Sequence, residues 1–197
     1  MTDKALSKRS LQNLTQFNKE TRRIARESME IALLNLLEIK PLGDITISEL
    51  VTKAGVSRNA FYRNYTSKEA IIEQLLVGVI RRIFRGLKQF DIKTQAYQAW
   101  LYLFTEAKKE AQLLKMIFKH HLHHLLTRLV TKRLKAYQKL KDKKQSHYKR
   151  LFWSNAIVSV LTNWISDDMI VPAEEMAAMG LPLLTKSSFW EPFYVNS

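Results

Sequence analysis

The sequence predicts an all-α fold, and three observations support this prediction. Glycine and proline are scarce, with 5 and 4 residues in a chain of 197. No proline lies between Pro41 and Pro172, and because proline is the strongest helix breaker, so long an interval favours helices. Apolar residues make up 46% of the chain and recur at helical spacing, which is enough to build a sizeable core.

The composition also excludes several classes of site. The chain has no cysteine, so disulfides, thiolate zinc sites and cysteine nucleophiles are excluded. It starts Met-Thr-Asp-Lys, without a charged and then apolar leader, and contains no apolar run long enough to cross a bilayer. We therefore expect a cytoplasmic protein that makes no membrane contact.

The residues around Gly55 predict two short helices joined by a tight turn. Before the glycine, Leu50, Val51 and Ala54 recur at helical spacing and give a first helix with one apolar face. Gly55 can adopt the positive φ that a reversal needs, and Ser57 can cap the next helix through its hydroxyl. That next helix is barely two turns long, so its neighbours must hold it in place. This arrangement is a helix-turn-helix, whose second helix enters the major groove of DNA.

Two capping-box patterns flank this turn. Thr46-Ile-Ser-Glu49 marks the start of the scaffold helix, and Thr66-Ser-Lys-Glu69 marks the start of a longer helix. In each pattern a hydroxyl and a carboxylate would satisfy exposed amides at the helix start. The amide ends of both helices are suitable places for DNA phosphates.

Four short motifs and the helix before them carry a resemblance to a known family. They are an apolar helix at 24–37, Ile-Thr-Ile-Ser-Glu-Leu at 45–50, Lys-Ala-Gly-Val-Ser-Arg at 53–58, Phe-Tyr-Arg-Asn-Tyr at 61–65 and Ser-Lys-Glu at 67–69. With these motifs, residues 21–76 resemble the DNA-binding domain of the tetracycline-repressor (TetR/AcrR) family of bacterial regulators. The resemblance implies a homodimer that binds double-stranded DNA, usually released by a small molecule in a variable C-terminal domain.

Carried onto this sequence, the resemblance implies DNA contacts from the scaffold helix, the recognition helix and the start of the next helix. The residues are Thr46, Ser48, Ser57, Arg58, Asn59, Tyr62, Asn64 and Lys68. We expect Arg58, Asn59 and Asn64 to reach base edges of a pseudo-palindromic operator. Two positions depart from the family pattern: Ala60 replaces a common threonine, and Asn59 replaces a common glycine. Both departures affect the choice of operator.

The predicted organisation is an N-terminal arm at 1–17, a three-helix DNA-binding domain at 18–78 and a helical regulatory and dimerisation domain at 79–197. We expect the first helix of the DNA-binding domain to run from Thr21 to Ile39 and to bury Ile24, Ile31, Leu34 and Leu37. A long helix from about Ser67 would link the two domains. Its glycines, Gly78 and Gly86, either let it bend or permit close packing.

The C-terminal half contains two apolar sets whose role the sequence leaves open. Aromatic residues at helical spacing could line a small-molecule pocket or form ordinary core: Trp100, Phe104, Phe118, Trp153 and Trp164. The last two helices, at 147–165 and after Val171, are expected to form a dimer interface as half of a four-helix bundle, although they could be intrachain core. The predicted interface residues are Phe152, Ala156, Val160, Trp164, Ala177 and Leu181.

The net charge of +14 is unevenly distributed. Residues 1–90 contain 16 Lys or Arg against 9 Asp or Glu, whereas residues 108–150 contain 14 against 2. The most basic region therefore lies outside the helix-turn-helix. It is either a solvated helix face, a site for an anionic effector, a surface for an acidic partner or a source of extra phosphate contacts.

The histidines at 120–124 are the strongest candidate for other chemistry. On one helix, His120 and His124 would share a face with the spacing of many metal-binding pairs, but no further ligand is placed nearby by the sequence. No catalytic set stands out, and we expect no cofactor and no enzyme activity. Two alternatives stay open at this point: a coactivator or adaptor that works through protein partners, and a metal-dependent enzyme or sensor built on the histidines.

Overall fold

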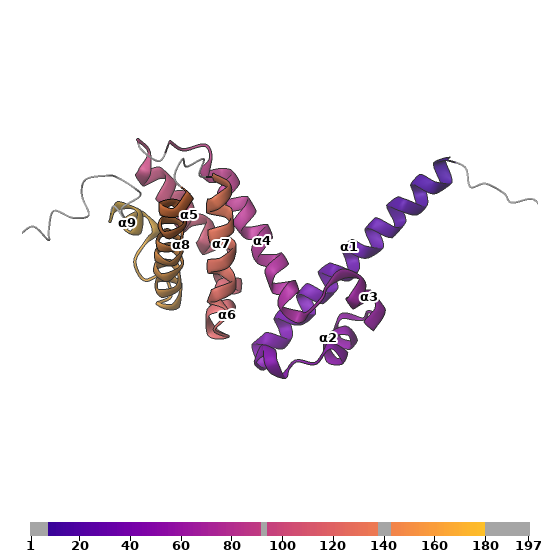
Figure 1. Ribbon diagram of the computed structural model, residues 1–197. Coiled ribbons are helices and arrows are strands. Elements are labelled where there is room, and N and C mark those ends of the chain that lie inside the picture. Colours follow the sequence, from indigo (N-terminus) through magenta and orange to yellow (C-terminus); the bar gives the residue numbers. More distant parts are fainter. Residues whose placement is uncertain (1–7, 92–93, 138–142, 180–197) are drawn as a thin grey trace, which may run out of the picture. The chain divides into compact units, whose positions relative to one another are not determined.

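The computed structural model describes residues 8–91, 94–137 and 143–179, and within these ranges the regular structure is helical, without a β-strand (Figure 1). The prediction of an all-α fold is confirmed. The chain divides into two compact units, one ending at Leu75 and the other beginning at Leu76. Helix α4 (Lys68–Leu87) contains this boundary. No helix in these ranges is long and apolar enough to cross a membrane.

The first unit consists of α1 (Lys8–Ile39), a short 3-10 helix η1 (Leu42–Asp44), α2 (Ile47–Ala54), α3 (Arg58–Asn64) and the start of α4. Helix α1 packs against both α2 and α3, and these two short helices contact each other. The core that joins them consists of fully buried apolar side chains, including Met29, Leu33, Leu50, Phe61 and Ile71.

Two expectations about the first helix are wrong. It begins at Lys8 instead of Thr21, and Leu11, Leu14 and Phe17 in its early turns are exposed. Ile24 and Ile31 were expected to be buried, but they are 52% and 61% exposed.

Leu37 is buried as expected, and the rest of the buried stripe of α1 is formed by Met29, Ala32, Leu33 and Leu36. The sequence at 29–37 is almost continuously apolar, so its periodicity does not select one face. The face is selected by packing against α2 and α3, which the spacing within α1 cannot report.

In the described ranges, the second unit contains the rest of α4 and five further helices. These are α5 (Ala96–Lys109), α6 (Ala111–Lys119), α7 (His123–Tyr137), α8 (Lys143–Ser166) and α9 (Ala173–Ala178). Helix α8 contacts α5, α6 and α7, and α9 packs on α5. Helix α8 begins at Lys143, and residues 138–142 before it lie outside the described ranges.

Helix α9 begins after Val171, as expected. Pro172 occupies its N-cap, and Glu174 and Glu175 lie in its first turn. Carboxylates at this end complement the helix dipole.

The two glycines of α4 differ in their surroundings. A Cβ at Gly86 would collide with the ring and hydroxyl of Tyr102 on α5, whereas a Cβ at Gly78 would meet nothing within 4 Å. Gly86 is therefore a close-packing position.

Candidate DNA interface

The turn between α2 and α3 is built as the sequence predicts. Gly55 has a φ of 66°, in the left-handed region that glycine adopts without a Cβ clash. The N–H of Val56 donates to the carbonyl of Val51 at 3.0 Å, and the N–H of Gly55 donates to that of Thr52 at 3.1 Å. These two bonds satisfy carbonyls at the end of α2 and reverse the chain within a few residues.

Hydroxyl caps fix the start of both short helices. Thr46 Oγ1 accepts from the N–H of Glu49 at 3.2 Å, and Ser57 Oγ accepts from the N–H of Ala60 at 3.0 Å. Both caps were predicted and are confirmed. The Lys40 ammonium, 2.7 Å from the Glu49 carboxylate, lowers the pKa of that carboxyl, and the backbone N–H of Thr46 contributes in the same direction.

The cap of α4 is one residue later than predicted. Ser67 Oγ, and not the hydroxyl of Thr66, accepts from the N–H of Ala70, at 3.2 Å. The two adjacent hydroxyl residues make either register possible from the sequence alone.

Helix α3 is held from behind by two aromatic side chains. Phe61 is fully buried, and Tyr65, at the C-cap, is 4% exposed. The Tyr65 hydroxyl donates to Glu30 Oε1 of α1 at 2.8 Å, and the guanidinium of Arg26 lies 5.7 Å from the ring centroid. Burial raises the pKa of Tyr65 to about 12. These contacts to α1 were not predicted, because residues far apart in the sequence make them.

The opposite face of α3 is polar and exposed. Ser57, Arg58, Asn59, Tyr62 and Arg63 are all exposed, and Tyr62 retains 60% of its accessible surface. Tyr62 thus presents its ring and hydroxyl to solvent beside the fully buried Phe61. Arg63 was not among the predicted contact residues; its signal is its position four residues after Asn59, on the same face of the helix.

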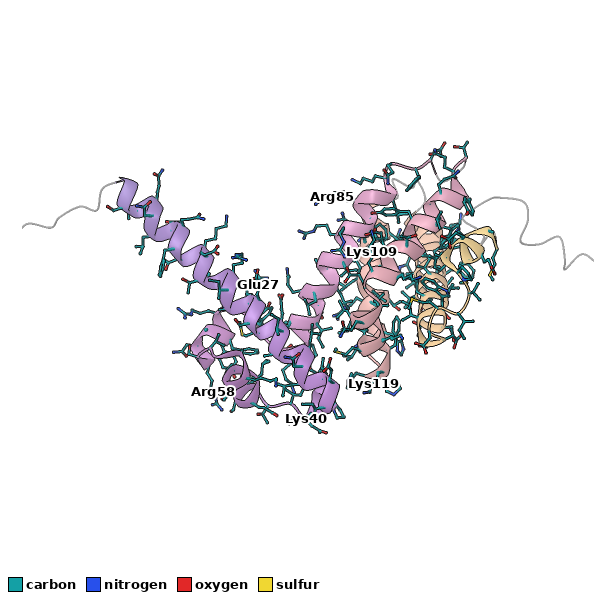
Figure 2. The ribbon with its side chains drawn as sticks, turned by 180° about the vertical axis from the view of Figure 1, so that it is seen from behind. Glu27, Lys40, Arg58, Arg85, Lys109 and Lys119 are labelled. Carbon is teal, nitrogen blue, oxygen red and sulfur yellow. The ribbon has the colours of Figure 1, made fainter. Side chains whose placement is uncertain are left out.

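The scaffold helix adds Thr46, which is exposed, and Ser48, which is half-buried. The guanidinium of Arg58 donates to Ser48 Oγ, so the predicted contact residues of α2 and α3 meet directly. Figure 2 labels Arg58 beside these two short helices. The resulting polar surface on α2 and α3 combines the hydroxyl of Ser48, the guanidinium of Arg58, the amide of Asn59 and the phenol of Tyr62.

Two further predicted contact residues are engaged within the first unit. The Asn64 side-chain amide donates to the carbonyl of Ala60 at 2.7 Å. Lys68 Nζ donates to the carbonyl of Leu42 at 2.6 Å and to that of Ile45, and Gly43 O is 3.5 Å away. The ammonium of Lys68 therefore ties the start of α4 to η1 and the strand-like segment after it.

The aromatic residues of the second unit pack against one another. The Trp100 and Phe104 rings are stacked with centroids 5.8 Å apart, and the Phe104 and Trp164 rings meet edge to face at 5.1 Å. Phe118 is buried in α6, and Trp153 is half-buried beside Phe152. None of the five lines the enclosed cavity of this unit.

That cavity has a volume of about 60 Å³ and a wholly apolar lining from α4 to α8, including Val79, Ile83, Leu103 and Leu161. Binding pockets for drug-sized ligands occupy roughly 300–1,000 Å³. In this conformation the cavity is therefore too small for such a ligand.

The predicted dimer residues fall into three groups. Phe152 is 53% exposed, Ala156 and Val160 are half-buried, and Trp164 and Ala177 are buried within the subunit; Leu181 lies outside the described residues. An open groove of about 690 Å³ runs beside α8 and α9, lined by Val160, Trp164, Ile170 and Met179 among others. Ile170 and Met179 are 81% and 60% exposed.

His120 and His124 do not share a helix, so the predicted metal-pair geometry is wrong. Helix α6 ends at Lys119, His121 has a φ of 56°, and α7 begins only at His123. His120 and His124 therefore lie on opposite sides of a turn. In the described ranges, no group of three or more His, Cys, Asp or Glu side chains is arranged to hold a metal ion.

Two family models match the chain. One, described as bacterial regulatory proteins, tetR family, matches residues 32–75; the other, described as transcriptional regulator C-terminal region, matches residues 98–186. The first match spans α2, the turn, α3 and the start of α4, where the exposed polar surface lies.

Curated relatives agree with these matches. The HTH-type transcriptional regulator EthR of Mycobacterium tuberculosis is 38% identical over 92 residues, covering 45% of this chain and 41% of that protein. EthR of Mycolicibacterium smegmatis is 33% identical over 79 residues, covering 38% of this chain and 36% of that protein. The matched part of the chain thus spans about two-fifths of the length of these curated relatives.

Proposed function

Because the chain belongs to the tetR family of bacterial regulatory proteins, we propose that it is a sequence-specific DNA-binding regulator of transcription. One observation carries the proposal: α3 buries Phe61 completely and turns Arg58, Asn59, Tyr62 and Arg63 outward. A short helix held rigidly by its apolar side and polar on the other is suited to insertion into the major groove.

Each exposed group has a role that follows from its chemistry. The Arg58 guanidinium can donate two parallel bonds to guanine, and the Asn59 amide can pair with adenine. Tyr62 is placed for a thymine methyl or a phosphate. The hydroxyls of Thr46, Ser48 and Ser57 stand at helix starts, where backbone amides favour phosphate.

Asn64 and Lys68 are less direct candidates. The side-chain amide of Asn64 already donates one N–H to a backbone carbonyl, so base contact would depend on its second N–H, on its carbonyl oxygen or on a rotamer change. Lys68 would have to exchange bonds to Leu42 and Ile45 carbonyls for a phosphate. We propose that Lys68 mainly positions the start of α4.

We propose that the protein acts as a homodimer joined through α8 and α9. The support is the exposed Phe152, the half-buried Val160 and the groove that continues to Ile170 and Met179. A two-fold dimer presents the same surface on both copies and would place two recognition helices on half-sites of a pseudo-palindromic operator.

We further propose that the protein is a repressor released by a small molecule, that it has no catalytic activity and that it works in the cytoplasm. The apolar cavity between α4, α5, α7 and α8 would have to expand to admit an effector. Because α4 lines this cavity and begins within the first unit, such an expansion would act on a helix that the two units share.

A gel-shift assay with DNA from upstream of the protein's own gene tests the proposed function. We expect a retarded complex that survives excess unrelated DNA and disappears with excess of the same fragment. A complex competed equally by both DNAs would indicate charge-driven binding only, without the proposed sequence recognition.

A further inference from the structure

A recess of about 280 Å³ lies on the second unit between α4 and α7 and shares Ile80 with the apolar cavity of about 60 Å³. Its lining consists of Val77, Ile80 and Arg81 from α4 and Leu129, Lys132 and Arg133 from α7. On each helix the three positions follow the spacing i, i+3, i+4, which places them on one face. Each of the two helices therefore lines the recess with both apolar and cationic side chains.

Among the described residues, no carboxylate pairs with the cationic side chains of the recess. Arg81 and Lys132 are exposed and Arg133 is half-buried, and none of the three forms an ion pair within the described ranges. Helix α7 contains no acidic residue. By contrast, the neighbouring Arg82 pairs with Glu110 and lies 3.8 Å from the Glu106 carboxylate.

Arg133 supplies a second, independent observation. Its Nε is buried and has no hydrogen-bond partner among the residues that the structure describes. A buried N–H of a charged group without an acceptor is destabilising, and native proteins nearly always satisfy such donors. An acceptor from outside the chain would remove this deficit.

The rest of the recess is apolar. Ile80 is 6% exposed, and Val77 and Leu129 are half-buried beside it. A simple ion would leave this surface uncovered, and an uncharged apolar molecule would leave the three cations without a partner. The enclosed cavity, lined only by apolar residues, offers nothing for an anion.

We propose that this recess binds a small amphipathic anion. A carboxylate or phosphate group accepts hydrogen bonds from Arg133, with Arg81 and Lys132 contributing charge, and a short apolar body covers Ile80, Val77 and Leu129. A guanidinium recognises both kinds of head group through paired, charge-assisted hydrogen bonds. This site does not depend on DNA recognition.

Isothermal titration calorimetry of the full chain, without DNA, tests the proposal with four probes. Octanoate and octyl phosphate carry both features, inorganic phosphate carries only the charge, and 1-octanol carries only the apolar body. We expect one saturable site per chain for at least one of the first two. The probe that binds more tightly of these two identifies the head group. Its affinity should be higher than that of inorganic phosphate and of 1-octanol by roughly tenfold or more.

Variants place the binding at this recess. Arg133→Gln should lower the affinity for the tightest-binding probe by roughly tenfold. Lys132→Gln, at an exposed position that tolerates substitution, should lower that affinity severalfold. Lys135→Gln removes the same charge from the same helix outside the recess and should leave affinity within about twofold.

Three results would overturn the proposal. They are no saturable binding of octanoate or octyl phosphate, inorganic phosphate binding as tightly as octyl phosphate (an adventitious ion only), or equal weakening by Lys132→Gln and Lys135→Gln. Because no DNA is present, these failures would leave the proposed regulatory function intact.

Discussion

The guanidinium of Arg58, at the start of α3, donates a hydrogen bond to Ser48 Oγ on α2. Two side chains that we propose as DNA contacts thus hold each other in place across the turn at Gly55. The bond orients the guanidinium before DNA arrives, so less conformational freedom is lost on binding. We therefore propose that Ser48 contributes to recognition through Arg58 as well as through its own hydroxyl.

Arg58→Ala should therefore weaken binding to the specific site by about 1–3 kcal/mol and relax the preference for one base pair. Ser48→Ala should cost less, about 0.5–1.5 kcal/mol, because the arginine remains but is no longer held. Fluorescence anisotropy on the specific site and on a scrambled duplex measures both. Equal losses on the two duplexes for Arg58→Ala would show that Arg58 contacts only phosphates.

Lys68 offers a test of the difference between binding phosphate and supporting the fold. Lys68→Met removes the donor to the carbonyls of Leu42 and Ile45, and we expect a loss of about 1–3 kcal/mol in the free energy of unfolding. The dependence of DNA affinity on salt should keep its slope. A slope lower by about one would instead show that Lys68 releases a counterion by contacting phosphate.

Substitution of Gly55 tests the backbone conformation of the turn, and Gly78 serves as its control. Neither would bring a Cβ within 4 Å of another residue, but only Gly55 has a positive φ. Gly55→Ala should destabilise the protein by about 1 kcal/mol through backbone strain, whereas Gly78→Ala, inside α4, should stabilise it by about 0.5–1 kcal/mol. Denaturant unfolding curves give both values. Two changes of the same sign would contradict the strain at Gly55.

Phe152 tests the proposed dimer. Phe152→Asp places a charge on the exposed apolar face of α8 and should shift the protein from dimer to monomer in sedimentation velocity. Tyr97→Asp, at a 43% exposed aromatic position on α5, is the control and should stay dimeric. If Phe152→Asp remained dimeric while folded, the interface would lie elsewhere.

The helix-turn-helix could be predicted from the sequence because its signals are local. The hydroxyls of Thr46 and Ser57 accept hydrogen bonds from amides three residues away, and the turn needs a glycine at position 55 because its φ is positive. Rules of this kind need no knowledge of the rest of the chain. The same rules could not choose between Thr66 and Ser67 as the cap of α4, since both are hydroxyl residues.

Features that depend on distant partners could not be predicted. Spacing places Trp100 and Phe104 on one face of α5, but it does not show that Trp164 fills the space beside them. Equally, the turn at His121 separates His120 from His124, although both fit a helical pattern in the sequence. The proposed anion recess also needs two helices brought together, and only the structure places Arg81 opposite Arg133.

A hydroxyl-radical footprint on DNA from upstream of the gene tests the central claim most directly. A dimer that inserts two α3 helices should protect two patches whose centres are about 34–36 Å apart along the duplex, and Arg58→Ala should weaken both together. Uniform or absent protection by the folded protein, unchanged by Arg58→Ala, would contradict the assignment of α3 as the recognition helix.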